Sequence, residues 1–400
     1  MLGAGRAGSS SHGGKTMRRV AIIGTGQTKH AKSHDDMNQA ELVRQAATRA
    51  LADAGITYRD VDAIVLSNME LFEGRALPEM WVGEGASGYL KPVMKIATGG
   101  TSGTSACIAG LHQCASGLFD TVLVVGWEKH SEGATQTGMA LTDPLWDRNI
   151  ASGAVGNFAL SISQYMAERG VTPEQAAKVA VKARRNAAKN PNAHLQMPDI
   201  TVDRVLSSRM LADPVHLLDM CPQSDGACAL VYAAEDRAES LCARPAWVRA
   251  TVTRHDQPYI GDLDRRLLTM RTLRDAARKA YQQVGITDPL NQIDVAEIYE
   301  PVSYAELAWY EALGLCAEGE AGKLIDDGST EMNGVLPVNP SGGVLSTNPV
   351  GASGVIRVAE AAMQIMVRAG AHQVANVRTA LATGYGVYAW SDVIILSADK

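Results

Sequence analysis

Two segments far apart in the chain repeat each other, and this duplication limits the possible folds more than any single motif. The first copy reads LADAGITYRDVDAIVLSNME (residues 51–70) and the second reads YQQVGITDPLNQIDVAEIYE (residues 281–300). Each copy runs from the end of an amphipathic helix through a Gly-Ile-Thr turn into a strand. Asp62 and Asp294 occupy the same place in the two copies.

The similarity continues downstream of both copies. The first is followed by TGGTSGTSAC (residues 98–107), an apolar helix ending near Ser116, and the strand FDTVLVVGWE (residues 119–128). The second is followed by SGGVLSTNPVGASG (residues 341–354), a helix over about residues 355–369, and apolar strands toward residues 393–396. A long helix–strand unit that occurs only twice predicts a duplicated α/β domain, because a solenoid needs at least three short repeats.

Composition excludes several classes of protein. Hydrophobic residues make up 46% of the chain and charged residues 20%, which is typical of a globular protein. The net charge of −6 provides no basic surface for nucleic acid. No apolar run approaches the roughly 20 residues of a membrane-spanning helix. We therefore expect a cytoplasmic protein with neither nucleic-acid nor membrane partners.

The cysteines and histidines predict no metal site. The six cysteines form no CxxC pair, and the nine histidines form no HExxH motif. Buried, reduced thiols are the expected state of Cys107, Cys114, Cys221, Cys228, Cys242 and Cys316. The turn GTGQT (residues 24–28) lacks the third glycine of GxGxxG, which argues against a dinucleotide site.

Three long motifs in this order resemble the thiolase superfamily, in particular the sterol-carrier-protein-x thiolases and the lipid-transfer-protein aldolases. They are YMAERGVTPEQAAKVAVKARRNAAKNPNA (residues 165–193), SSRMLADPVHLLDMCPQSDGACALV (residues 207–231) and LPVNPSGGVLSTNPVGASG (residues 336–354). The resemblance implies an α/β, five-layered α-β-α-β-α fold of two duplicated halves with an inserted loop domain. It also implies that the N-termini of the two central helices meet at the site and stabilise an anion.

The resemblance divides the chain into five expected parts. These are a disordered, Gly/Ser-rich extension (1–16), the N-terminal half (17–130), a loop region on the substrate and CoA side (131–217), the end of the N-terminal half with a linker (218–260), and the C-terminal half (261–400). The family also implies a homodimer formed through the first half, and we expect residues 101–128 at the centre of its interface.

The nucleophile of the thiolases is missing. Thiolases carry a catalytic cysteine in a run such as CASG or CSTG, and the matching run here is GTSG, with Gly100 in the cysteine position. Cys107 lies about two helical turns further along and cannot substitute without a register change. We therefore expect a mechanism without an acyl-enzyme, and hence insensitivity to thiol alkylation.

Two further departures favour an aldolase. Tyr299, in EIYEP, stands where thiolases have the histidine of runs such as ELHDAF, and lipid-transfer-protein aldolases have a tyrosine there, in LYDHF. Asn348 replaces the histidine of the thiolase Gly-His-Pro motif. The aldolases carry a second tyrosine near that place and this chain does not, so Tyr304, Tyr385 or water would have to assist.

The expected activity is retro-aldol cleavage of a β-hydroxyacyl-CoA, as in lipid or steroid side-chain degradation, with no bound cofactor and the CoA thioester as substrate. Tyr299 would act as base, if nearby donors lowered its pKa from about 10, or as hydrogen-bond donor. The candidate catalytic residues are Tyr299, Asn348 and Gly100, and the candidate substrate-binding residues are Thr101, Ser102, Glu300, Tyr304, Gly342, Gly343 and Tyr385.

Two alternatives remain open at this point. One is Claisen-type acyl transfer, and the other is a catalytically silent scaffold that binds acyl-CoA. A zinc-ribbon and OB-fold (DUF35-type) protein is the partner that the resemblance implies. The acyl group itself cannot be read from the sequence.

Overall fold

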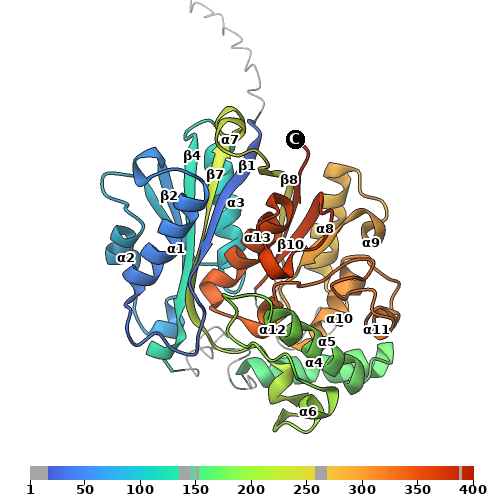
Figure 1. Cartoon of the computed structure of the whole chain (residues 1–400). Helices are drawn as coiled ribbons and strands as arrows, with labels where there is room; N and C mark the ends of the chain where they lie inside the picture. The colour runs from blue at the N-terminus through green and yellow to red at the C-terminus, as the bar shows by residue number, and fades with distance from the viewer. Residues whose placement is uncertain are drawn as a thin grey trace, which may run out of the picture.

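The two copies of the repeat form the two halves of one mixed sheet (Figure 1). The computed structural model describes residues 17–134, 145, 147, 149, 153–256, 268–386 and 390–400, so the expected extension at 1–16 lies outside the described residues. Within these, nine strands pair in the order β3-β2-β4-β7-β1-β8-β11-β10-β9. The first five strands belong to the first half, and the short pairing of β1 with β8 joins the halves.

Each half combines strands of the sheet with the helices that pack on them. The first half contains β1 (Val20–Gln27), α1 (Gln39–Asp53), β2 (Ala63–Ser67), α2 (Glu79–Gly85), β3 (Val93–Ile96), α3 (Ser102–Ala115), β4 (Thr121–Lys129), β7 (Asp225–Ala234) and α7 (Glu235–Leu241). The second half contains β8 (Ala246–His255), α8 (Arg271–Val284), α9 (Pro289–Gln292), β9 (Val295–Glu297), α10 (Ser303–Ala312), α11 (Ala321–Asp326), α12 (Gly343–Ser346), α13 (Val350–Met366), β10 (Thr379–Gly386) and β11 (Trp390–Ser397). The range 218–260 thus includes β8, which pairs with β11 of the second half rather than serving only as a linker.

Asp62 and Asp294 make the same hydrogen bonds in the two halves. The carboxylate of Asp62 accepts from the backbone N–H groups of Asp120 and Thr121, at 2.9 Å each, where β4 begins. The carboxylate of Asp294 accepts from Arg378 and Thr379, at 2.8 Å each, where β10 begins. The matching aspartates therefore fasten the repeated strand to its neighbour in each half.

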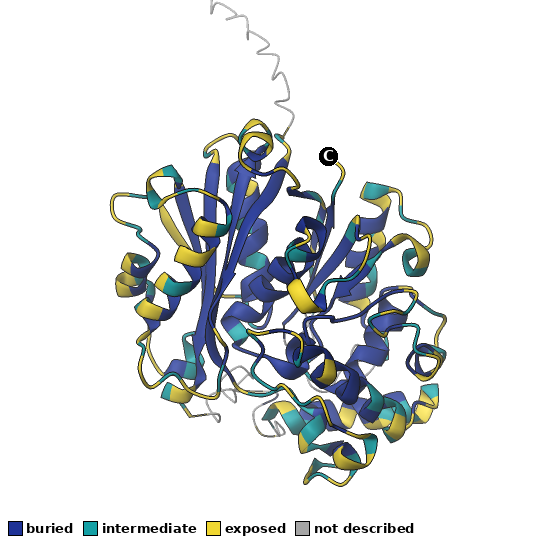
Figure 2. Cartoon of the chain, viewed as in Figure 1, coloured by how far each residue is buried: buried dark blue, intermediate teal, exposed yellow. Residues whose placement is uncertain are grey.

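The expected five layers are present: the two halves of the sheet form two of them, and helices form the other three. Helix α1 covers the outer face of the first half of the sheet, α8 covers the outer face of the second, and α3 and α13 lie between the two (Figure 1). The central helices touch backbone to backbone, because a Cβ at Gly103 would lie 2.6 Å from the amide nitrogen of Val355 and 2.8 Å from Cα of Gly354. Burial is accordingly almost complete along α13, in contrast to the half-exposed outer helices (Figure 2).

The loop region packs mainly against the second half. It contains α4 (Gly153–Arg169), α5 (Pro173–Ala187), α6 (Val202–Leu206) and a short hairpin of β5 (Met210–Ala212) and β6 (Val215–His216). Helix α5 begins at a local capping signal, since Thr172 and Gln175 form a capping box around Pro173. Its buried face packs against α10, α11 and α12.

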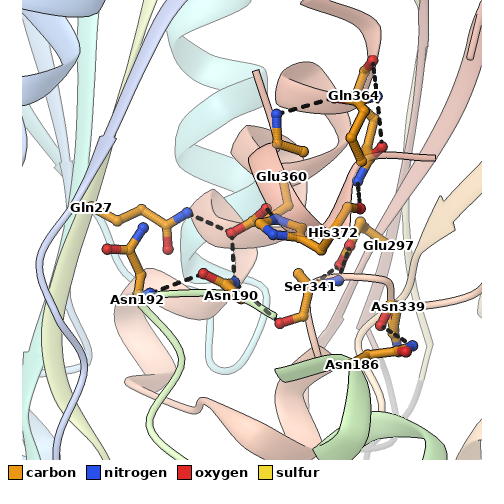
Figure 3. A network of polar contacts seen from close by, with 12 residues as sticks. Gln27, Asn186, Asn190, Asn192, Glu297, Asn339, Ser341, Glu360, Gln364 and His372 are labelled. Atoms are coloured by element: carbon orange, nitrogen blue, oxygen red, sulfur yellow. Dashed lines mark hydrogen bonds and ion pairs between the residues drawn. The ribbon is translucent and has the colours of Figure 1, made fainter. Parts of the chain in front are cut away.

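A buried polar network fastens the loop region to both halves (Figure 3). Glu360 of α13 accepts hydrogen bonds from Gln27 of β1 at 2.7 Å and from Asn190 at 3.1 Å, and it pairs with His372 at 2.8 Å. A buried charge is tolerated only when it is paired and hydrogen-bonded, as Glu360 is here. The network therefore fixes the end of α5 relative to α13.

The His372–Glu360 pair should make stability depend on pH. Burial lowers the pKa of His372, but the Glu360 carboxylate outweighs this and raises it above the ordinary value of 6.5. The stabilisation by the pair is then fully present below that ordinary value and is lost as the pH rises through the higher folded-state pKa. His372→Gln should cost about 3–5 kcal/mol near pH 6 and clearly less near pH 9, measured by chemical denaturation. An equal cost at both pH values would contradict this, and His112→Gln, on the exposed end of α3, is the control.

Candidate active site

The candidate site lies at the N-terminus of α3, beside the end of β10. A Cβ atom at Gly100 would overlap the carbonyl oxygen of Tyr385 and would lie 3.4 Å from the hydroxyl oxygen of Tyr299. The backbone of β10 thus closes the position where a thiolase nucleophile would project. The space beside it is occupied by the hydroxyl group of Tyr299.

Tyr299 is held in place from several sides. It follows β9, its side chain is only 4% exposed, and its backbone N–H donates to Thr383 Oγ1 at 2.9 Å. Its hydroxyl lies 3.5 Å from Asn348 Oδ1. Burial, and then the neighbouring Cys221, raise the pKa of Tyr299 above its ordinary value. Of the two roles expected for Tyr299, this raised pKa favours the hydrogen-bond donor over the base.

Asn348 is fixed by its backbone and by its side chain. Its N–H donates to Ser224 Oγ at 3.1 Å, and Ser224 Oγ in turn lies 2.9 Å from Nδ1 of His194. Asn348 Oδ1 accepts from Ser353 Oγ at 2.8 Å, and its Nδ2 donates to the sulfur of Cys221 at 3.2 Å. The amide therefore bridges Tyr299 and Cys221.

Cys221 is the site residue that the sequence did not reveal. Its backbone N–H bonds to the carbonyl of Pro301 at 3.0 Å, and its side chain is half-buried beside Asn348. Burial raises the pKa of Cys221 to about 11, while the hydrogen bond from Asn348 and the charge of Arg184 act in the opposite direction. A cysteine followed by proline in MCPQSD carried no catalytic signal, and only the fold brings it to Tyr299.

Protein groups occupy the N-terminus of the central helix α13. At the start of α13, the N–H of Gly351 donates to Glu128 Oε2 at 2.8 Å and that of Val350 to Nε2 of His130 at 3.5 Å. Burial lowers the pKa of His130 to about 4, so its neutral imidazole can accept this bond. The N-terminus of α13 therefore does not meet the expectation that both helix N-termini stabilise an anion, and for α3 the expectation stays a prediction.

The remaining candidates near α3 and α12 have structural contacts. Thr101 Oγ1 donates to Thr98 O, and Ser102 Oγ donates to Gly99 O, each at 2.6 Å, which shapes the turn that presents Gly100. A Cβ at Gly342 would lie 2.6 Å from Cβ of Ala187 of α5, and one at Gly343 would overlap the Glu300 carboxylate. Gly342 thus permits close packing of the loop region, and Gly343 permits close approach of the Glu300 side chain.

Glu300, Tyr385 and Tyr304 lie in different surroundings. Glu300 accepts from the N–H of Leu345 at 3.1 Å, and burial raises its pKa to about 8. The Tyr385 ring packs edge-on against Trp309 at a centroid distance of 4.7 Å. Burial, and then the carboxylates of Asp219, Glu174 and Asp213, raise the pKa of Tyr304. Tyr304 is therefore not part of the Tyr299–Asn348 cluster.

Comparison with known proteins identifies the family. Residues 20–236 match the family described as thiolase, N-terminal domain, and residues 255–398 match thiolase C-terminal domain-like. The chain belongs to the thiolase family. It is 32% identical to an acetyl-CoA acetyltransferase of Methanothermobacter thermautotrophicus, over 90% of this chain and 94% of that protein. It is 31% identical to sterol carrier protein 2 of Gallus gallus, over 92% of this chain and 70% of that protein.

A solved structure supports the same branch of the thiolase family. The Ltp2–ChsH2(DUF35) aldolase superposes with a TM-score of 0.82 at 27% identity, covering 96% of this chain and 99% of that one. The expected five-layered fold and the expected sterol-carrier-protein-x-like branch are confirmed, as is the expectation of a thiolase-like enzyme. In the described part of this family member, no group of three or more His, Cys, Asp or Glu side chains could hold a metal, and no helix is long and apolar enough to cross a membrane.

The prediction that residues 101–128 lie at the centre of a homodimer interface is wrong for strand β4. Strand β4, within the expected segment 101–128, pairs with β2 on one side and β7 on the other, and all of its residues are buried. It cannot contact a second subunit. The edge of the first half is β3, whose first two residues are exposed.

A thiolase cysteine should not be tolerated at Gly100. Gly100→Cys should lower the free energy of unfolding by about 1–3 kcal/mol, because the added Cβ must displace the β10 backbone at Tyr385. It should form no acyl-enzyme when incubated with a β-ketoacyl-CoA, as judged by intact-protein mass spectrometry. A stable variant that accumulates an acyl adduct on the new cysteine would show that the position is open after all.

Proposed function

We propose that this thiolase-family enzyme cleaves a carbon–carbon bond of a β-hydroxyacyl-CoA by a retro-aldol reaction. The observation that carries the proposal is the replacement at the start of α3: the β10 backbone fills the nucleophile position, and the Tyr299 hydroxyl lies beside it. A retro-aldol reaction needs a base and an enolate-stabilising site but no covalent intermediate. The CoA thioester is the substrate, and no bound cofactor is required.

Each part of the site has a role in this reaction. The thioester oxygen lies against the N-terminus of α3, where the helix dipole and the Tyr299 hydroxyl stabilise the negative charge of the enolate. Without substrate the single O–H of Tyr299 points to Asn348 Oδ1, 3.5 Å away, and it would turn from there to the enolate oxygen. One preorganised donor of this kind typically contributes about 10² to 10³ in rate. The raised pKa of Tyr299 suits this role, because a protonated phenol donates and a phenolate does not.

The relatives support two neighbouring reactions. The similarity to the Ltp2–ChsH2(DUF35) aldolase favours carbon–carbon cleavage, with a lipid or steroid side-chain thioester as the substrate class. The similarity to an acetyl-CoA acetyltransferase favours Claisen-type acyl transfer as the second candidate. The closed Gly100 position supports the aldolase proposal over acyl transfer, because acyl transfer through a thiolase cysteine needs that space.

Tyr299→Phe tests the role of the hydroxyl. The change keeps the ring, so stability should change little, while turnover of a β-hydroxyacyl-CoA should fall by about 10² or more. Asn348→Ala should cost a similar or smaller factor, and a rise in KM alone would indicate lost ground-state binding. Tyr304→Phe is the matched control, because it removes a buried phenol hydroxyl outside the cluster.

The result of this experiment separates enzyme from scaffold. Equal rates for wild type and Tyr299→Phe would remove Tyr299 from the mechanism. If the wild-type protein releases neither ketone nor aldehyde from a panel of β-hydroxyacyl-CoA thioesters, both alone and with a zinc-ribbon and OB-fold partner, the scaffold interpretation is correct. The chain is then an acyl-CoA-binding scaffold.

The edge strand β3 is the proposed homodimer surface. It pairs with β2 on one side only, so its other edge offers free backbone groups to a second strand. Large apolar side chains are exposed on and around it: Leu77, Met80, Trp81, Tyr89, Leu90, Val93 and Met94. Exposed apolar side chains on and around an unpaired strand edge favour an interaction site there.

Met94→Lys should weaken the dimer. We expect the wild-type protein to scatter light at about twice the monomer mass of 42.4 kDa and the variant to shift toward monomer. Leu118→Lys is the control, since Leu118 is exposed near the opposite end of α3. A wild-type protein that is monomeric alone but binds a DUF35-type protein through this surface would assign the surface to that partner instead.

A further inference from the structure

Three side chains from distant parts of the sequence meet through one amide. Asn348 receives the Tyr299 hydroxyl at its oxygen, 3.5 Å away, and donates from its nitrogen to the Cys221 sulfur at 3.2 Å. Tyr299 lies on the α3 side of the amide, next to Gly100. Cys221 lies on the other side, and it is half-buried whereas Tyr299 is almost fully buried.

A buried cation adjoins the sulfur. Arg184 of α5 is fully buried, and its Nη2 donates to the carbonyl of Met220, the residue before Cys221, at 3.0 Å. Its Nε and Nη1 atoms have no hydrogen-bond partner. The charge of Arg184 lies close enough to lower the pKa of the Cys221 thiol. A guanidinium with two unused donors next to a cysteine stabilises a negative charge at that place.

We propose that Cys221 is the proton-transfer group of the retro-aldol reaction and that Tyr299 is the enolate-binding group, with Asn348 holding the two apart. This assignment rests on the proposed function and adds to it the second acid–base residue. It fills the role of the second tyrosine that the aldolase resemblance called for and that this sequence lacks. It involves no covalent bond between Cys221 and the acyl group.

The step balances without a further reactant. The thiolate sulfur of Cys221 takes the proton of the β-hydroxyl group, and the O–H electron pair becomes the second bond of the released ketone or aldehyde. The carbon–carbon bond pair moves onto Cα and forms the thioester enolate, whose oxygen accepts from Tyr299. Cα then takes the proton from the Cys221 thiol, which restores the thiolate. Nothing is oxidised and no net proton is consumed.

The pKa values of Cys221 and Tyr299 favour Cys221 as the proton-transfer group and Tyr299 as the enolate-binding group. Burial raises the pKa of Cys221 to about 11, whereas burial raises that of Tyr299 further, from a higher ordinary value. Burial raises the pKa of Cys316, a half-buried thiol outside the site, to about 12. Arg184 favours the thiolate of Cys221, Glu300 opposes it, and Tyr299 faces it as a neutral phenol. Of the two site groups, Cys221 gives up its proton more readily.

Cys221→Ala is the direct test, with Cys316→Ala as the matched control. On a β-hydroxyacyl-CoA that the wild type cleaves, Cys221→Ala should reduce turnover by about 10² or more, and Cys316→Ala should not. Exchange of the Cα hydrogens of the released acyl-CoA in D₂O should fall in parallel. Wild-type turnover should rise about tenfold per pH unit between about pH 7 and pH 9, as the thiolate fraction grows, and this slope should vanish in Cys221→Ala.

The possible outcomes are distinct. Cleavage, exchange and pH slope that persist in a folded Cys221→Ala variant would overturn the assignment while leaving the proposed reaction in place. An acyl adduct on Cys221 in wild-type protein would overturn it as well, by making the cysteine a nucleophile. If the wild type cleaves no member of the panel of thioesters, the proposed function itself is overturned, and the assignment of Cys221 fails with it. If Cys221→Ala fails to fold, Cys221→Ser is assayed instead and should be as inactive, because its hydroxyl is a far weaker acid.

The same geometry changes the expectation about alkylation. A mechanism without a thiolase nucleophile was expected to be insensitive to iodoacetamide. Cys221 is half-buried in the site, so its modification should inhibit the enzyme, and bound acyl-CoA should protect it. Inhibition by alkylation is therefore no sign of an acyl-enzyme in this protein.

Discussion

The contact between α3 and α13 at Gly103 and Gly354 determines where every part of the site lies. Because the two backbones touch there, neither helix can slide or tilt without a clash. The contact lies in the first turns of both helices, so it also fixes Gly100 and Asn348, which precede them. The hydroxyl of Tyr299 then falls between these two fixed points, at distances that a flexible support could not maintain.

The buried polar network also holds the site residues in place, through its contacts with the loop region. Arg357 pairs with Glu297 of β9. Ser341 donates to the same carboxylate at 2.7 Å, and Asn190 donates to Ser341 O at 3.1 Å (Figure 3). Buried ion pairs seldom add much stability, since desolvation offsets their attraction. Their effect here is to hold one arrangement: the end of α5, which carries Arg184, is fixed relative to the strand end that carries Tyr299.

The sequence determined the fold more fully than the site. The repeat, its paired aspartates and the capping signal at Thr172 were all local patterns, and the structure contains each of them. Gly100, Tyr299 and Asn348 could be found because they depart from a known pattern. Cys221 and Arg184 could not, because their role depends on contacts between segments far apart in the chain. The raised pKa of Tyr299 is likewise a property of its burial.

Two errors have a common physical cause. An apolar strand buried on both faces and an apolar strand at a subunit interface have the same composition, so the sequence of β4 could not distinguish them. Similarly, two equivalent helix starts do not reveal that Glu128 and His130 occupy one of them. Pairing partners decide both cases, and these exist only in the folded chain.

The sealed N-terminus of α13 has a stereochemical consequence. Two open helix ends on opposite sides would let an enolate oxygen settle toward either one, and the planar enolate could then present either face. In the proposed retro-aldol reaction, the closing of α13 by Glu128 would leave the enolate oxygen one anchoring direction, toward α3 and Tyr299. One face of the enolate would then be turned toward Cys221. Because the duplication makes the two helix starts equivalent, the closing of one of them would remove one of two similar orientations of the enolate, as a stereoselective reaction requires.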